Sequence, residues 1–144
     1  MNENWEPQET NTHQDHVIAH VIGATVLGYF VLDETIHLLL DIGFIWKIFV
    51  DGEMGLLPHP VATSELEVSD TARSEIRSDV DELLGHKLHA ENLRRLIQPK
   101  VECLINEVSF FVREHERRLV LTGDEATLTI ETSIETAEIR LYEF

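Results

Sequence analysis

The sequence predicts an α+β fold, in which N-terminal strands and a short helix precede a central pair of helices and C-terminal antiparallel strands. Three observations support this prediction. β-branched and aromatic residues crowd residues 16–32, as is typical of strands. Apolar residues recur with helical spacing between residues 69 and 116, and they alternate with polar residues over much of 117–144. Because helical and strand segments are segregated along the chain, α+β is favoured over an alternating α/β fold.

The chain has 144 residues, of which 43% are hydrophobic, and this length predicts one domain with a sizeable core. Residues 1–14 are polar, contain Pro7 and show no periodicity, so we expect a flexible N-terminal tail. The single α+β domain is therefore expected to span residues 15–144.

The first apolar segment, HVIAHVIGATVLGYFVL (residues 16–32), favours strand over helix. It is too long for one ordinary strand, so Gly23 or Gly28 is expected to mark a bulge or a bend. The next segment, DETIHLLLDIG (residues 33–43), predicts a short helix, because Asp33 suits its N-cap and apolar residues share one helical face. A continuing strand over TIHLLLD is the alternative.

The segment FIWKIFVDGEMGLLP (residues 44–58) predicts a hairpin with its turn at Asp51-Gly52. Residues 58–68 are expected to form a loop or linker. At the end of the chain, the alternation in residues 117–144 predicts two or three antiparallel strands.

Two helical segments are expected in the middle of the chain. Residues 69–98 form the longer one, whose apolar stripe shifts at Gly85, and a break there would let both halves face one core. Residues 99–116 have the most regular helical pattern in the chain. On this predicted helix Cys103 and Phe110 lie away from the apolar stripe, which indicates a second partner, such as another subunit.

The chain is strongly acidic, with 27 Asp and Glu residues against 11 Lys and Arg residues and a net charge of −16. Phosphate backbones and anionic lipids attract basic surfaces, so direct nucleic-acid binding and membrane binding are disfavoured. The acidity is expected to serve solubility, with adaptation to a saline environment or an acidic interface as the alternatives.

Cysteine usage and the N-terminal segment predict a cytoplasmic protein. The one cysteine, Cys103, cannot form an internal disulfide, which fits a reducing compartment. Residues 1–15 have neither a basic start nor an apolar core, so they lack the features of a signal peptide. The longest apolar run, residues 17–32, is shorter than the roughly 20 residues that a membrane span needs.

Three histidines lie within the eight residues of HQDHVIAH, at His13, His16 and His20. On a helix they share one face, where His16 and His20 are candidate ligands for a divalent metal. On a strand His16 and His20 lie about 13 Å apart, too far to share one ion. The β-branched residues from Val17 onward favour the strand and so weaken this candidate site.

A second candidate metal site consists of Glu82, His86 and His89, which continue a stripe that begins at Asp79 on an ideal helix. Carboxylate and imidazole groups on one face suit a divalent transition metal. Gly85 interrupts this stripe, and both histidines fall on the apolar side, so packed histidines are the alternative.

The remaining chemistry-bearing residues have simple interpretations. An Asp33–His37 pair could orient a general base, but Asp33 also suits a helix cap and His37 a packed or solvated position. The neighbouring Glu102 would raise the pKa of Cys103 rather than lower it. The sequence has no GxSxG, HExxH, GxGxxG or CxxC motif, so no catalytic residue is assigned.

These features predict an interaction or structural module that forms a homo-oligomer and has no catalytic activity. Apolar residues in excess of a core, such as Trp46, Phe110 and Tyr142, support the oligomer. The alternative is a protein that binds a small molecule or a divalent metal, extending to a simple metal-dependent enzyme. Eight histidines, several of them near carboxylates, support this alternative, and no other cofactor is expected.

Overall fold

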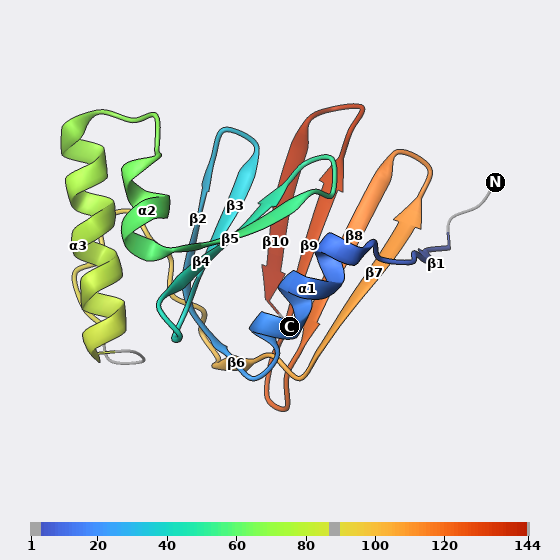
Figure 1. Cartoon of the computed structure of the whole chain (residues 1–144), viewed down its shortest axis with the longest axis horizontal. Coiled ribbons are helices and arrows are strands. Elements are labelled where there is room, and N and C mark those ends of the chain that lie inside the picture. Colours follow the sequence, from blue (N-terminus) through green and yellow to red (C-terminus); the bar gives the residue numbers. More distant parts are fainter. Residues whose placement is uncertain (1–3, 87–89, 144) are drawn as a thin grey trace.

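A computed structural model of the chain describes residues 4–86 and 90–143. It contains two five-stranded sheets, and helices α2 and α3 cover one of them (Figure 1). This sheet, four of whose strands come from the N-terminal half of the chain, is the middle layer, and the second sheet packs on its other face. Strands at both ends of the chain with helices between them confirm the predicted α+β class.

Neighbouring strands in both sheets are antiparallel. The N-terminal sheet has the order β5-β4-β3-β2-β6, with β2 (Thr25–Leu32), β3 (Thr35–Leu40), β4 (Phe44–Phe49), β5 (Met54–Pro58) and β6 (Cys103–Leu104). The C-terminal sheet has the order β1-β7-β8-β9-β10, with β1 (Glu6–Pro7), β7 (Glu107–Arg113), β8 (Glu116–Thr122), β9 (Thr127–Ser133) and β10 (Glu138–Glu143). The helices are α1 (Thr12–Val21), α2 (His59–Ser64) and α3 (Asp70–His86).

Two apolar clusters hold the three layers together. The larger one lies between the sheets and includes the fully buried Trp46, together with Val17 and Val21 from α1. The smaller one joins the other face of the N-terminal sheet to α2 and α3, with Val80 and Leu83 of α3 fully buried. Burial of each such side chain contributes about 1.5–3 kcal/mol. None of the helices in the described ranges is long and apolar enough to span a bilayer.

Helix α1 occupies residues for which a strand was predicted. Its start is a capping box, in which the Asn11 side chain accepts the Gln14 N–H and the Gln14 side chain accepts the Asn11 N–H. The strand prediction is right only from Thr25, where β2 begins. The register of β2 shifts between Val26 and Gly28, which confirms the expected irregularity near Gly28.

The short helix predicted at residues 33–43 is wrong, and its strand alternative, β3, is right. Asp33 and Glu34 have φ angles of 49° and 62° and form the turn between β2 and β3, so Asp33 caps no helix. All six residues of β3 are buried, because β3 is the central strand and both of its faces are covered. Alternation, the usual signal of a strand, is therefore lost.

The hairpin predicted at residues 44–58 is confirmed by β4 and β5, which are joined at Asp51-Gly52. The Gly52 N–H donates to the Phe49 carbonyl inside this turn. The loop predicted at residues 58–68 is wrong in part, because α2 occupies His59–Ser64. The segment of the predicted N-terminal tail that follows residue 3 contains β1 and the start of α1.

The long helix predicted at residues 69–98 is right only as far as His86, where α3 ends. Within the described part beyond it, residues 90–98 contain no helix. Asp79 of α3 gives the physical reason, because its carboxylate accepts backbone N–H groups of this segment at 2.6–3.1 Å. The same N–H groups would be bonded to preceding carbonyls in a helix.

The helix predicted at residues 99–116 is wrong, since this segment forms β6 and β7. Val108 and Phe110 of β7 pack against the core between the sheets, and Phe111 follows on the opposite face. The apparent helical stripe combined Val108, which packs against this core, with Phe111 on the opposite face of the strand. The strands β8, β9 and β10 confirm the C-terminal antiparallel prediction.

Candidate functional site

The first candidate metal ligands, His16 and His20, are exposed on α1. His20 Nδ1 lies 2.8 Å from the His16 carbonyl oxygen, one helical turn earlier. His13 Nε2 lies 3.0 Å from the Met54 carbonyl oxygen. The helix thus provides the spacing that a shared ion needs, but two of the three rings contact backbone oxygens.

The structure describes two of the three residues of the second candidate metal site, Glu82 and His86. Glu82 and His86 form an ion pair of 3.8 Å on α3, with 62% of the His86 side chain exposed. His89 lies outside the described residues. No three His, Cys, Asp or Glu side chains in the described ranges form a group that would hold a metal ion. Both metal sites remain predictions.

Two other residues considered for chemistry are buried. His37 stacks on Phe30 with ring centroids 4.4 Å apart, and burial together with the nearby Lys47 charge lowers the His37 pKa to about 4. This geometry agrees with the packed interpretation of His37. Cys103 is fully buried, and burial raises the pKa of its thiol, which disfavours the nucleophilic thiolate.

The residues that supported an oligomer interface lie mostly inside the molecule. Trp46 is fully buried and Phe110 packs against the core between the sheets. Cys103, placed with Phe110 on the far side of the predicted helix, is also in that core. Of the residues cited for this interface, Tyr142 is partly exposed, on β10.

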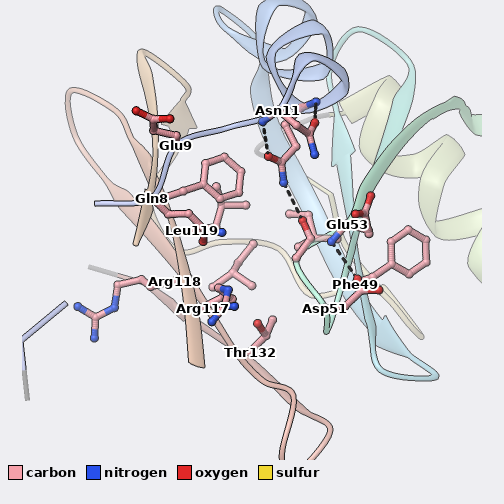
Figure 2. Close-up of a pocket in the computed structure, with 15 residues that line it drawn as sticks. Gln8, Glu9, Asn11, Phe49, Asp51, Glu53, Arg117, Arg118, Leu119 and Thr132 are labelled. Atoms are coloured by element: carbon pink, nitrogen blue, oxygen red, sulfur yellow. Dashed lines mark hydrogen bonds between the residues drawn. The ribbon is translucent and has the colours of Figure 1, made fainter. Parts of the chain in front are cut away.

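A cavity of about 180 Å³ lies between the two sheets, where the β4–β5 turn faces β8 and β9 (Figure 2). It is lined by Gln8, Glu9, Asn11, Gln14, Ile48, Phe49, Asp51, Gly52, Glu53, Phe110, Arg117, Arg118, Leu119, Ile130 and Thr132. Pockets for drug-sized ligands measure about 300–1,000 Å³, so this cavity suits a smaller molecule.

The C-terminal sheet supplies an apolar floor that ends in two polar groups. Leu119 and Ile130 are paired across β8 and β9 and belong to the core between the sheets. Two residues away along each strand, Arg117 is paired with Thr132. Because side chains alternate along a strand, Arg117 and Thr132 share the face of Leu119 and Ile130. A guanidinium and a hydroxyl therefore lie side by side at one end of the apolar floor.

Both groups have unused hydrogen-bonding capacity. Thr132 is only 5% exposed, and its Oγ1 has no hydrogen-bond partner within the described part of the chain. Arg117 Nη1 donates to the carbonyl oxygens of Glu114 and Glu116 at 3.1 and 3.0 Å. No ion pair with a carboxylate is formed by Arg117 in the described ranges. A guanidinium carries five N–H donors, so others remain for a ligand.

The neighbouring Arg118 is arranged differently. Its Nε donates to Glu131 at 2.7 Å, and its guanidinium lies over the Trp5 ring, 4.2 Å from the centroid. Figure 2 shows the Arg118 side chain directed away from the cavity, whereas Arg117 lies close to Thr132. Arg117 is therefore the arginine whose charge acts inside the cavity.

The N-terminal segment closes one side of the cavity by bonding to both sheets. The Gln8 N–H donates to the Phe110 carbonyl at 2.9 Å, in the C-terminal sheet. Gln14 Nε2 donates to the Gly52 carbonyl at 3.1 Å, in the β4–β5 turn (Figure 2). This wall is consequently held in place without a ligand.

The cavity was not predicted, although part of its signal is visible in the sequence. Arg117, Leu119 and Leu121 alternate, so a charged residue continues an inward-facing apolar row. No family model matches this chain, and neither does any curated protein or any solved structure.

Proposed function

We propose that this chain is a binding protein without catalytic activity, and that its ligand is a small molecule carrying a carboxylate, held in the cavity between the two sheets. The observation that carries the proposal is the pairing of Arg117 with Thr132 at the end of an apolar floor. Ligand sites typically combine apolar walls with a few convergent polar groups.

The chemistry of these two residues favours a carboxylate. A guanidinium and a carboxylate form parallel, charge-assisted hydrogen bonds, and hydrogen bonds to charged groups contribute about 1.5–3 kcal/mol each. The Thr132 hydroxyl is buried, but a rotation about χ1 would place it where the methyl group now lies. A ligand oxygen that accepts from this hydroxyl would give Thr132 a hydrogen bond that no described residue provides.

The test is a titration of ¹⁵N-labelled protein, followed by amide chemical shifts, with small carboxylic acids, their α-amino derivatives and the matching amides. We expect saturable shifts at Gly52 and Thr132 with the carboxylate compounds and weaker ones with the amides. Arg117→Gln should abolish these shifts. Thr132→Val should weaken binding while leaving stability intact, because the lost hydroxyl has no partner among the described residues.

Arg118→Gln is the matched control, since Arg118 is adjacent in sequence but paired with Glu131 outside the cavity. This variant should bind as the unaltered chain does. The proposal is overturned if no compound of the panel binds, or if Arg118→Gln loses as much affinity as Arg117→Gln.

A second candidate function, the homo-oligomeric module, is supported by strand β10. β10 is the last strand of its sheet, and among the described strands it pairs only with β9, so its other edge borders no strand. Such an edge is a template for pairing with a second copy of the chain. Light scattering at micromolar concentration should then give a dimer mass or more, and a monomer mass would remove this candidate.

We also propose a cytoplasmic location for this protein. Its support is the single cysteine, Cys103, which is a free and fully buried thiol. A reducing compartment keeps such thiols unpaired.

A further inference from the structure

We infer that the ligand of the cavity is a zwitterion, namely a small α-amino acid with an aliphatic side chain, whose carboxylate faces Arg117 and Thr132 and whose ammonium faces the β4–β5 turn. This inference rests on the proposed function and names the ligand class for the same site. It follows from the charge around the cavity, from the groups left unpaired there and from the size of the apolar floor.

The charge lining the cavity disfavours a simple anion. Two carboxylate residues of the β4–β5 turn, Asp51 and Glu53, line the cavity, against the guanidinium of Arg117, which forms no ion pair in the described ranges. The net charge of the whole chain, −16, adds to the same negative potential. A ligand that carries only a carboxylate would bond to Arg117, but the negative potential of the cavity would repel it. A zwitterion makes the same bonds with no net charge.

The β4–β5 turn offers carboxylates to the positive end of such a ligand. Asp51 Oδ1 accepts the backbone N–H of Glu53 at 2.9 Å, which fixes the turn. No lysine, arginine or histidine in the described ranges forms an ion pair with Asp51 or Glu53. Figure 2 shows this turn across the cavity from Arg117 and Thr132. The two charged ends of an amino acid therefore have separate partners on opposite walls.

The apolar floor of the cavity determines which side chain the amino-acid ligand would carry. Ile48, Leu119 and Ile130 bring aliphatic groups from both sheets to the cavity. With a volume of about 180 Å³, the cavity has room for a short aliphatic chain. Two to four carbon atoms beyond the α-carbon would cover this floor, so 2-aminobutyrate and valine are suitable probes.

The experiment compares four probes on the full chain by calorimetry and amide shifts: 2-aminobutyrate, valine, butyrate and propylamine. Butyrate lacks the ammonium and propylamine lacks the carboxylate. We expect each amino acid to bind at least about tenfold more tightly than butyrate or propylamine. Equal or tighter binding of butyrate overturns the zwitterion while leaving the proposed function in place. If none of the four binds, the proposed function fails with it.

A charge variant gives an independent result. Asp51→Asn combined with Glu53→Gln removes both turn carboxylates while keeping an acceptor for the Glu53 N–H. The preference should then move from 2-aminobutyrate toward butyrate, because the field has become less negative and the ammonium has lost its partners. Glu135→Gln, an exposed residue outside the cavity, should leave the preference unchanged. An unchanged preference in the double variant would also overturn the inference.

Discussion

His37 couples the stability of this fold to pH. Its ring is 4% exposed and stacks on Phe30, and burial with the nearby Lys47 lowers its pKa to about 4. An unfolded histidine has a pKa of about 6.5, so the unfolded chain binds this proton more tightly. The stabilising contribution is therefore complete above about pH 6.5 and declines as the pH falls toward 4.

We expect the free energy of unfolding to fall by about 2 kcal/mol between pH 7 and pH 5 because of His37. Urea unfolding at a series of pH values measures this loss. His37→Phe keeps a ring that can stack on Phe30 but cannot titrate, so most of the decline should disappear. His86→Gln, on the exposed end of α3, serves as the control. An identical pH dependence in His37→Phe and the unaltered chain would contradict this assignment.

The residues of the candidate site show why local patterns predicted so little of it. Arg117 and Thr132 become neighbours only through the pairing of β8 with β9. That pairing was predictable from alternation, but the opposite wall at Asp51 comes from the other sheet. The histidine clusters were predictable as candidate sites because their members are close in sequence. The distance between His16 and His20 depends on whether a helix or a strand forms there, and the sequence favoured the strand where the structure has α1.

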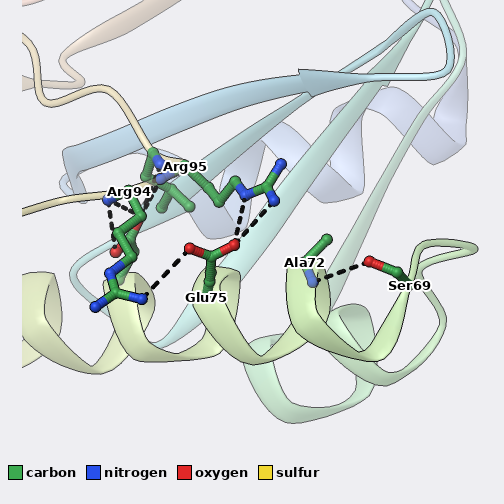
Figure 3. A network of polar contacts seen from close by, with 7 residues as sticks. Ser69, Ala72, Glu75, Arg94 and Arg95 are labelled. Atoms are coloured by element: carbon green, nitrogen blue, oxygen red, sulfur yellow. Dashed lines mark hydrogen bonds and ion pairs between the residues drawn. The ribbon is translucent and has the colours of Figure 1, made fainter.

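At the scale of elements, Asp79 determines where α3 and the following segment lie. Its buried carboxylate accepts the backbone N–H groups of Arg94, Arg95 and Leu96. The side chains of Arg94 and Arg95 form ion pairs with Glu75 (Figure 3). A carboxylate is a pure acceptor and matches three converging donors. Residues 94–96, for which a continuing helix was predicted, are held against α3 instead.

Asp79→Asn should lower the free energy of unfolding by about 3 kcal/mol, because an amide places donors against buried N–H groups. Chemical denaturation followed by circular dichroism measures it. Glu75→Gln is the matched control on the same helix. Its partners are the partly exposed Arg94 and Arg95, so its effect should be much smaller. Equal losses in the two variants would show that the Asp79 contacts do not hold the segment.

Elements with a distinctive local signal were predicted correctly. The Asp51-Gly52 turn identified the β4–β5 hairpin, and alternation identified β8 to β10. The errors have physical causes. β3 is buried on both faces and so has no alternation, and β7 carries Phe110 and Phe111 on opposite faces. For α1 the signal was present in the Asn11 capping box, but the β-branched residues after it suggested a strand.

At the scale of the whole molecule, the division into three layers places the cavity. The helices cover one face of the N-terminal sheet, and the other face packs against the C-terminal sheet. The cavity opens where these two sheets and the N-terminal segment meet, so its walls come from residues more than 100 positions apart. Only the assembled fold brings such residues together, which is why the fold class was predictable and the site was not.

The net charge of −16 makes a prediction for the molecule as a whole. Like charges on a compact chain repel one another, and salt screens this repulsion as the Debye length falls from about 10 Å at 0.1 M to about 3 Å at 1 M. Salt also weakens attractive surface pairs such as Arg140–Glu138, but exposed pairs contribute little. Repulsion should therefore dominate, and sodium chloride should stabilise the fold.

We expect the midpoint of thermal unfolding at pH 7 to rise by about 3–5 °C between 0.05 and 1 M sodium chloride, equivalent to about 1 kcal/mol. Differential scanning calorimetry measures the shift. The control is the same series near pH 4.7, the isoelectric point, where the net charge and its repulsion vanish. The His37→Phe variant is the form to use there, because it removes the destabilising protonation of His37 at that pH. A midpoint that is insensitive to salt at pH 7, or that falls, would mean that paired charges rather than net repulsion govern the surface.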